Sequence, residues 1–233
     1  MAGDLAEEWP SETWWRGHAS EGFTLQPGIH RADRGGRAEQ NLSLRFRQQA
    51  PSRQANCPEQ DDFVAWLFLM QHYGLPTRLL DWTASVLVAL FFATSERSDE
   101  GAHLYALNPR ELNRVVTADA TLVPPTSSPA RELFVGAFND RVQEEATISV
   151  MAHEIDKRML AQQSTFTIHG SSQALDAHPD SARFLRVFNV PAAAKQTITA
   201  QLDSIGLRRS TLFPDLENLA ADLKGLTFPG IDA

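Results

Sequence analysis

Polar side chains crowd one short stretch of the chain, residues 70–83, which reads MQHYGLPTRLLDWT. Six of them are candidates for chemistry: His72, Tyr73, Thr77, Arg78, Asp81 and Trp82. The apolar runs FVAWLFLM and SVLVALFFA flank this stretch, and runs of this kind belong in a protein core. Because a buried polar group without a partner costs about 1–3 kcal/mol, these groups must be bonded. They form either a network that braces the fold or the floor of a functional site.

Arg16 is the second candidate for chemistry, and Gly17 follows it in the segment TWWRGH. An arginine keeps its charge and is rarely buried without a partner. Arg16 therefore either forms a buried ion pair with Asp81 or binds an anionic ligand. Further arginines between residues 31 and 53 form a solvated face or a site for a phosphate-bearing ligand, because the planar guanidinium suits phosphate oxygens.

The elements that position these residues follow from periodicity and caps. We expect a strand over 13–18 and a helix over 37–50. Asp61 or Asp62 is placed to cap a buried helix that runs through Met70, with Gly74 as its stop. The segment 75–82 then reads as a short connection, and Thr83 as the cap of a second buried helix over 84–95. Together these elements predict a buried helix–loop–helix.

The rest of the chain mixes helices and strands. We expect further strands over 101–108, 164–170 and 184–191, and further helices over 109–116, 147–162, 192–206 and 213–225. The strands are too scattered for a regular βαβ array. The sequence predicts one α+β domain over 1–233 with a mixed sheet, a core of about 12–225, and flexible ends at 1–11 and 226–233.

Composition and missing motifs exclude several classes. The 233 residues carry a net charge of −8, which argues against a general nucleic-acid binder. A single cysteine, Cys57, excludes an internal disulfide and a thiolate-rich zinc site. HEIDK begins like a zinc-protease helix but has Lys157 where the second histidine would be, so we expect no metal. No apolar leader or membrane-length run is present, which favours a cytoplasmic protein without membrane contact.

Four segments of the chain resemble the FRG domain family, which is named for a Phe-Arg-Gly-like motif near its start. WWRGH resembles that motif, with Trp15 at the usual aromatic position. LMQHYGLPTRLLDWTASVLVALFFA is similar to the long central signature of the family. RMLAQQSTFTIHG and LFPDLENLAADL resemble its later blocks, with Ser164 where glycine is usual, and Glu39 also fits the pattern.

The Arg-Gly pair at an early strand also resembles the nucleotide-binding arginine of ADP-ribosyltransferases, and this implies a similar fold with NAD as substrate. The resemblance implies roles for residues of this chain. Arg16 and Gly17, with Thr77, Arg78 and Asp81, would bind the nucleotide, and His72 and Tyr73 would line the nicotinamide-ribose pocket. Gln162 or Gln163 lies where the transferase glutamate is expected. A glutamine carries no charge, so another acid must serve, with Glu39, Glu145 and Glu154 as candidates.

Two kinds of function remain open. The first is an NAD-cleaving enzyme or ADP-ribosyltransferase that acts as a bacterial toxin or phage-defence effector, with a possible protein partner or antitoxin. The second is a non-catalytic module that binds a nucleotide or a protein, which would explain the missing glutamate. An RNA-directed activity through the early arginines is a third hypothesis, and the acidic net charge disfavours it.

Overall fold

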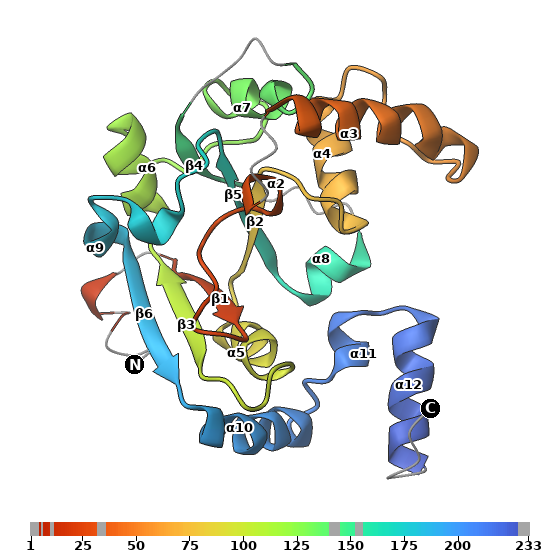
Figure 1. Ribbon diagram of the computed structural model, residues 1–233, viewed down its shortest axis with the longest axis vertical. Helices are drawn as coiled ribbons and strands as arrows, with labels where there is room; N and C mark the ends of the chain where they lie inside the picture. The colour runs from red at the N-terminus through yellow and green to blue at the C-terminus, as the bar shows by residue number, and fades with distance from the viewer. Residues whose placement is uncertain are drawn as a thin grey trace.

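The computed structural model describes residues 5, 7–9, 12–31, 36–139, 145–151 and 156–227 (Figure 1). Its strands are β1 (Trp14–His18), β2 (Leu79–Thr83), β3 (Ala102–Leu107), β4 (Thr147–Val150), β5 (Ser164–His169) and β6 (Leu185–Val190). The longer helices are α3 (Gly36–Gln49), α4 (Phe63–His72), α5 (Val86–Thr94), α6 (Pro109–Thr117), α7 (Ala130–Gly136), α10 (Ala192–Ser204) and α12 (Leu216–Thr227). The shorter ones are α2 (Gly28–Arg31), α8 (Lys157–Ala161), α9 (Ser181–Phe184) and α11 (Arg209–Leu212), with 3-10 turns at Ala50–Ser52 and Leu175–Ala177.

Within the described residues, the six strands form one sheet in the order β4-β5-β2-β1-β3-β6. The α+β class is therefore confirmed. The named strands all pair antiparallel, so the sheet is not the mixed one that we expected. An antiparallel sheet that packs against helices is typical of this class.

The sheet consists of two halves that meet at β1 and β2. Strand β1 pairs with β3 over five residues, and β2 pairs with β5 over five residues. Between β1 and β2, in contrast, the register of these fully described strands contains one pair, Trp15 opposite Thr83. The two central strands diverge beyond that pair, and this divergence leaves space within the sheet.

Strand β1 packs against α5 at very short range because of Gly17. A Cβ atom at this position would lie 1.9 Å from the carbonyl oxygen of Ala89 and 2.6 Å from the amide nitrogen of Ala93. Trp15, on the same side of the strand, belongs to a buried cluster that includes Ala89 and Ala93. Only glycine allows the helix backbone to approach the strand this closely.

The capping signals place α4 as expected. The Asp62 carboxylate accepts a hydrogen bond from the Ala65 amide at 3.0 Å, and Gly74 follows the helix with a φ of +74°. Most of the helix is buried, including Trp66, Phe68 and Met70. These contacts fix the start of the stretch 70–83 against the core.

The prediction of a buried helix–loop–helix is wrong, because strand β2 lies where we expected a short connection. Leu79, Leu80, Trp82 and Thr83 are all buried within the sheet, and their ladder partner is β5. Four of the five residues of β2 are buried, on both faces of the sheet, so the run gives no alternating pattern and periodicity did not reveal a strand. Ser85, and not Thr83, caps the next helix, because the Ser85 hydroxyl accepts a hydrogen bond from the Val88 amide.

The prediction of one helix over 147–162 is also wrong. Thr147–Val150 form β4, whose four residues are all buried, and helical structure begins at Lys157 in α8. The apolar spacing that suggested one helix face includes Ile148 and Met159, which belong to different elements of the same buried cluster. Residues 152–155 lie outside the described part of the chain.

The two ends of the described chain differ in burial. Leu5 and Trp9 are buried against the face of the sheet that α5 covers, so the core extends beyond the expected boundary at residue 12. At the other end, α12 has its expected leucines at 216, 219 and 223, and all three are exposed. In Figure 1, α11 and α12 lie to one side of the sheet. Among the helices described, none has both the length and the apolar character that a membrane crossing needs.

The close approach at Gly17 gives a stability prediction. We expect Gly17→Ala to lower the free energy of unfolding by about 3 kcal/mol, the upper end for overpacking, because the new methyl meets helix backbone that cannot rotate away. Urea denaturation measures the change. Gly225→Ala is the matched control, since nothing lies within 4 Å of that added Cβ and alanine favours the helix by about 0.5–1 kcal/mol. Equal effects of the two substitutions would contradict this account of the packing.

Candidate functional site

A cleft of about 390 Å³ opens where β1 and β2 diverge. Its walls come from β1, β2, α5, α8 and the loops beside them, and a volume of this size suits a small-molecule ligand. The side chains with polar groups in its lining are Arg16, His18, Arg31, Gln71, Asp81, Trp82, Thr83, Ser95, Glu96, Arg158, Gln162 and Ser164. Trp15, Phe23, Val88 and Phe92 supply apolar surface.

Arg16 spans the gap between the two strands. Its Nη1 donates to the backbone carbonyl of Asp81 at 2.5 Å and lies 3.9 Å from Oδ2 of the same residue. Burial lowers the pKa of the Arg16 guanidinium, and the Asp81 carboxylate opposes that shift. An arginine remains charged under such conditions, so the cleft contains a fixed cation at its centre.

His18 orients this arginine. Arg16 Nε lies 3.0 Å from His18 Nε2, and His18 Nδ1 lies 3.3 Å from the Phe23 carbonyl oxygen. Burial, with the nearby Arg16 charge, lowers the pKa of His18 to about 3. The ring is therefore neutral near pH 7, with its proton on Nδ1 towards Phe23 and its Nε2 accepting from Arg16. A charged His18 would repel Arg16.

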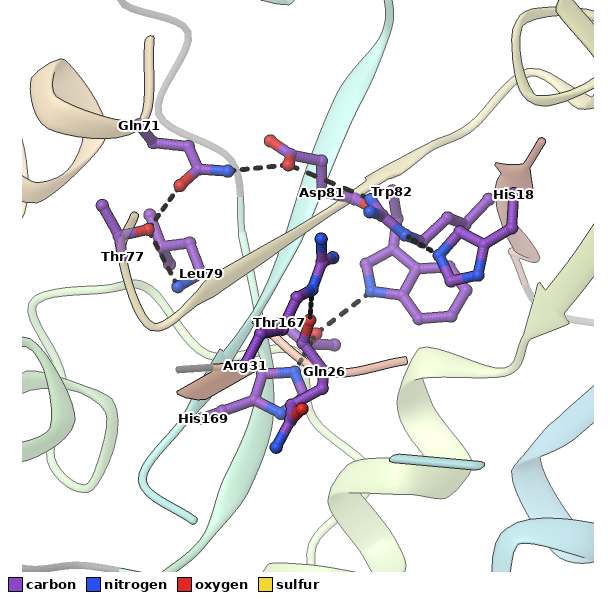
Figure 2. A network of polar contacts seen from close by, with 11 residues as sticks. His18, Gln26, Arg31, Gln71, Thr77, Leu79, Asp81, Trp82, Thr167 and His169 are labelled. Atoms are coloured by element: carbon purple, nitrogen blue, oxygen red, sulfur yellow. Dashed lines mark hydrogen bonds and ion pairs between the residues drawn. The ribbon is translucent and has the colours of Figure 1, made fainter. Parts of the chain in front are cut away.

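Asp81 is held in place by a chain of side-chain hydrogen bonds that Figure 2 shows. Gln71 Nε2 donates to Asp81 Oδ2 at 2.7 Å. Gln71 Oε1 accepts from the Thr77 hydroxyl, which in turn accepts from the Leu79 amide at 3.1 Å. Thr77 is buried and Asp81 is half-exposed, so the chain leads from the core to the surface of the cleft.

Two further arginines line the cleft. Arg158 lies over the Phe213 ring with its guanidinium carbon 4.6 Å from the centroid, and its Nη1 is 3.4 Å from the His72 carbonyl oxygen. Arg31 donates from Nε to the Gln26 carbonyl at 2.9 Å, a contact that Figure 2 also shows. Neither arginine forms an ion pair with a carboxylate among the described residues. The rest of their donors remain for a ligand.

The structure brings together four of the predicted site residues: Arg16, Gly17, Asp81 and Gln162 all line the cleft. The carbonyl oxygen of Gln162 accepts from the hydroxyl of Thr83 at 2.7 Å, and its side-chain amide donates to the Leu212 carbonyl at 3.0 Å. Glu154 lies outside the described residues.

The other predicted residues lie elsewhere. His72 has its Nδ1 2.7 Å from Asp156 Oδ2 and lines a smaller hollow of about 30 Å³ beside the cleft. The exposed Tyr73 donates its hydroxyl to Gln54 at 2.7 Å. Neither residue lines the cleft itself, and Thr77 reaches it only through its hydrogen bond to Gln71.

Arg78 braces the fold and does not face the cleft. Its Nε and Nη2 donate to the carboxylate of Glu39 at distances of 2.6–3.1 Å, and its Nη1 donates to the Leu133 carbonyl at 3.0 Å. Both partners of this ion pair are buried. Glu39 is therefore not available as a catalytic acid, and Glu145 lines a different hollow.

Sequence reasoning missed His18, Gln71 and Arg158 as cleft residues, and it named Arg31 only as part of the early arginine cluster that could bind a phosphate-bearing ligand. His18 had a usable signal, because it lies two residues after Arg16 on a strand and so shares its face. Gln71 is adjacent to His72, but its orientation depends on the end of α4. Arg31 and Arg158 reach the cleft from separate elements, and their positions depend on the tertiary fold.

The Arg78–Glu39 pair predicts a large effect of a single uncharged substitution. We expect Glu39→Gln to lower the free energy of unfolding by about 3–5 kcal/mol, because it leaves the buried Arg78 charge uncompensated. Denaturant unfolding measures this change in the free energy of unfolding. The matched control, Asp203→Asn, breaks the more exposed pair with Arg208, and its expected cost is below about 1 kcal/mol. A Glu39→Gln protein as stable as the control would show that the pair is not a brace.

A second histidine, His169, gives a pH prediction. It is fully buried beside Thr167, and burial lowers its pKa from 6.5 to about 3. Between these values the unfolded chain binds a proton that the folded protein excludes, so the free energy of unfolding falls with decreasing pH. The slope per histidine is about 1.4 kcal/mol per pH unit. Urea unfolding between pH 6 and pH 4.5 should show a shallower slope for His169→Gln than for the wild type, and equal slopes would contradict the assignment.

Comparison with known proteins identifies part of the chain. The family model of the FRG domain matches residues 11–102. This range includes β1, α4 and β2, and with them Arg16, His18, Gln71 and Asp81, whereas Arg158 and Gln162 lie beyond it. No curated protein and no solved structure matched the chain. The protein contains an FRG domain over residues 11–102.

Proposed function

We propose that the cleft binds an NAD-like dinucleotide and that the protein cleaves its nicotinamide–ribose bond. The observation that carries this proposal is the meeting of three arginines, Arg16, Arg31 and Arg158, in one cleft that also has aromatic walls. Guanidinium groups suit the paired phosphates of a dinucleotide. Phe23 and Phe92 offer apolar surface for planar bases.

The arrangement of the cleft along the chain supports the same ligand. Arg16 comes from β1, Thr83 from the end of β2, and Gln162 from the residues just before β5. The resemblance to ADP-ribosyltransferases places a phosphate-binding arginine on an early strand and the residue that acts on the ribose later in the chain. Cleavage would release nicotinamide and pass ADP-ribose to water or to a protein acceptor. The role of a bacterial toxin or phage-defence effector is part of this proposal and rests on the resemblance alone.

A non-catalytic nucleotide-binding module is the second candidate, and one observation favours it. Gln162 is uncharged, and its amide is already bound to the Leu212 carbonyl. A missing electrostatic contact to the transition state costs a factor of about 10²–10³ in rate. In this case the arginines would hold the ligand without turnover.

Nicotinamide release tests the proposed reaction. Purified protein incubated with NAD should release nicotinamide, and Arg16→Ala should lose most of this activity because the central cation and its contact across the strands disappear. Chromatography of the products measures turnover. Arg53→Ala is the control, since Arg53 is exposed, lies outside the cleft, and bonds through its side chain to Gln49 and Ser52 among the described residues.

The outcomes separate the two candidates. Release by the wild type and the control, but not by Arg16→Ala, supports an NAD-consuming enzyme. If no protein releases nicotinamide, yet NAD raises the melting temperature of the wild type alone, the binding-module reading holds, because a ligand that binds only the folded state stabilises it. No release and no stabilisation would contradict both.

A further inference from the structure

We infer that Asp81 is the catalytic carboxylate of the cleft, which stabilises the positive charge that develops on the ribose as nicotinamide leaves. This inference rests on the proposed NAD-cleaving function. It assigns to Asp81 the negative charge that the uncharged Gln162 cannot provide. It assigns Asp81 a role in the chemical step, in place of the nucleotide-binding role that the sequence suggested.

The strand directs Asp81 into the cleft. In β2 the four neighbours Leu79, Leu80, Trp82 and Thr83 are buried, whereas the Asp81 side chain is 51% exposed. It lines the cleft beside Arg16, on the part of the strand that has already diverged from β1. A carboxylate at this point faces the space that a ligand would fill.

Hydrogen bonds fix one oxygen of this carboxylate and leave the other open. Gln71 donates to Oδ2 at 2.7 Å, and Gln71 is itself held by the buried Thr77 (Figure 2). Among the described residues, no hydrogen bond or ion pair reaches Oδ1. Electrostatic stabilisation is strongest when the group is already oriented before the reaction, and this arrangement meets that condition.

The other acids of the described chain fit the role less well. Glu39 is bound to Arg78 in the core, and Glu145 lines a separate hollow. Glu96 lines the cleft, but it lies in the exposed turn after α5, and no side-chain bond that orients its carboxylate is found among the described residues. Asp81 alone among these four combines access to the cleft with a fixed orientation.

Asp81 would act in the cleavage of the bond between nicotinamide and ribose. The bond between ribose C1′ and the nicotinamide nitrogen breaks, and its electron pair stays on nicotinamide, which leaves as a neutral molecule. The positive charge passes to the ribose ring as an oxocarbenium ion, next to the negative charge of Asp81. A water oxygen, or a nucleophilic atom of an acceptor, then forms the new bond to C1′ and releases one proton to the solvent. No oxidant or reductant is needed.

The test compares Asp81→Asn with the wild type in two separate measurements, the kcat for nicotinamide release and the Kd for NAD. Asparagine keeps the size and the contact to Gln71 but removes the charge. We expect kcat to fall by about 10²–10³-fold, with Kd changed by only a few-fold. Asp99→Asn, at an exposed residue outside the cleft, should retain both values. Thermal unfolding checks that each variant is folded.

Gln71→Leu is the second variant, and it keeps the charge of Asp81 while removing the contact that orients it. We expect a smaller loss of kcat with Kd retained, which marks Gln71 as a positioning residue. This variant also tests the inference if Asp81→Asn does not fold.

Several results would overturn the inference. A kcat for Asp81→Asn within about threefold of the wild type, well short of the expected loss, would show that the charge plays no part. A large rise in Kd without a loss of kcat would return Asp81 to a binding role. A loss of kcat in Glu96→Gln but not in Asp81→Asn would assign the acid to Glu96. Inactivity of the wild type itself would contradict the proposed function, and is distinguishable from these results.

Discussion

The fold depends on one constraint, which is that β1 and β2 pair at a single position and then separate. Gly17 sets the path of β1, because only a residue without a Cβ lets α5 approach so closely. Beyond Trp15 and Thr83 the two strands need another link, and Arg16 supplies it by donating to the Asp81 carbonyl. The same arginine therefore joins the halves of the sheet and places a positive charge in the cleft between them.

The polar stretch at 70–83 both braces the fold and forms part of the cleft. Arg78 points into the core, where Glu39 and the Leu133 carbonyl take up its donors. Asp81, three residues later, points into the cleft. Gln71 and Thr77 connect these two environments, since Thr77 is buried and Gln71 reaches the Asp81 carboxylate. A structural side chain, Arg78, and a ligand-facing one, Asp81, thus lie only three positions apart in the chain.

Local signals in the sequence predicted much of the fold. The cap Asp62 and the stop Gly74, for example, mark the two ends of α4 through contacts within a few residues. The errors at β2 and β4 have a common cause, because both strands are short and largely buried on both faces, and such runs resemble buried helix. Arg16, Asp81 and Gln162 reach the same cleft because the strands bring them together. Tyr73 and Arg78, although close to Asp81 in sequence, point elsewhere because of the end of α4 and the burial of the Glu39 pair.

A crystal structure of the protein with a slowly cleaved NAD analogue tests the central claim most directly, because it locates the ligand independently of turnover. The account predicts that the analogue lies in the cleft between β1 and β2, with its phosphates against Arg16 and one or both of Arg31 and Arg158, and with ribose C1′ next to the free oxygen of Asp81. An analogue bound at another surface, or one whose phosphates lie away from these arginines, would contradict it.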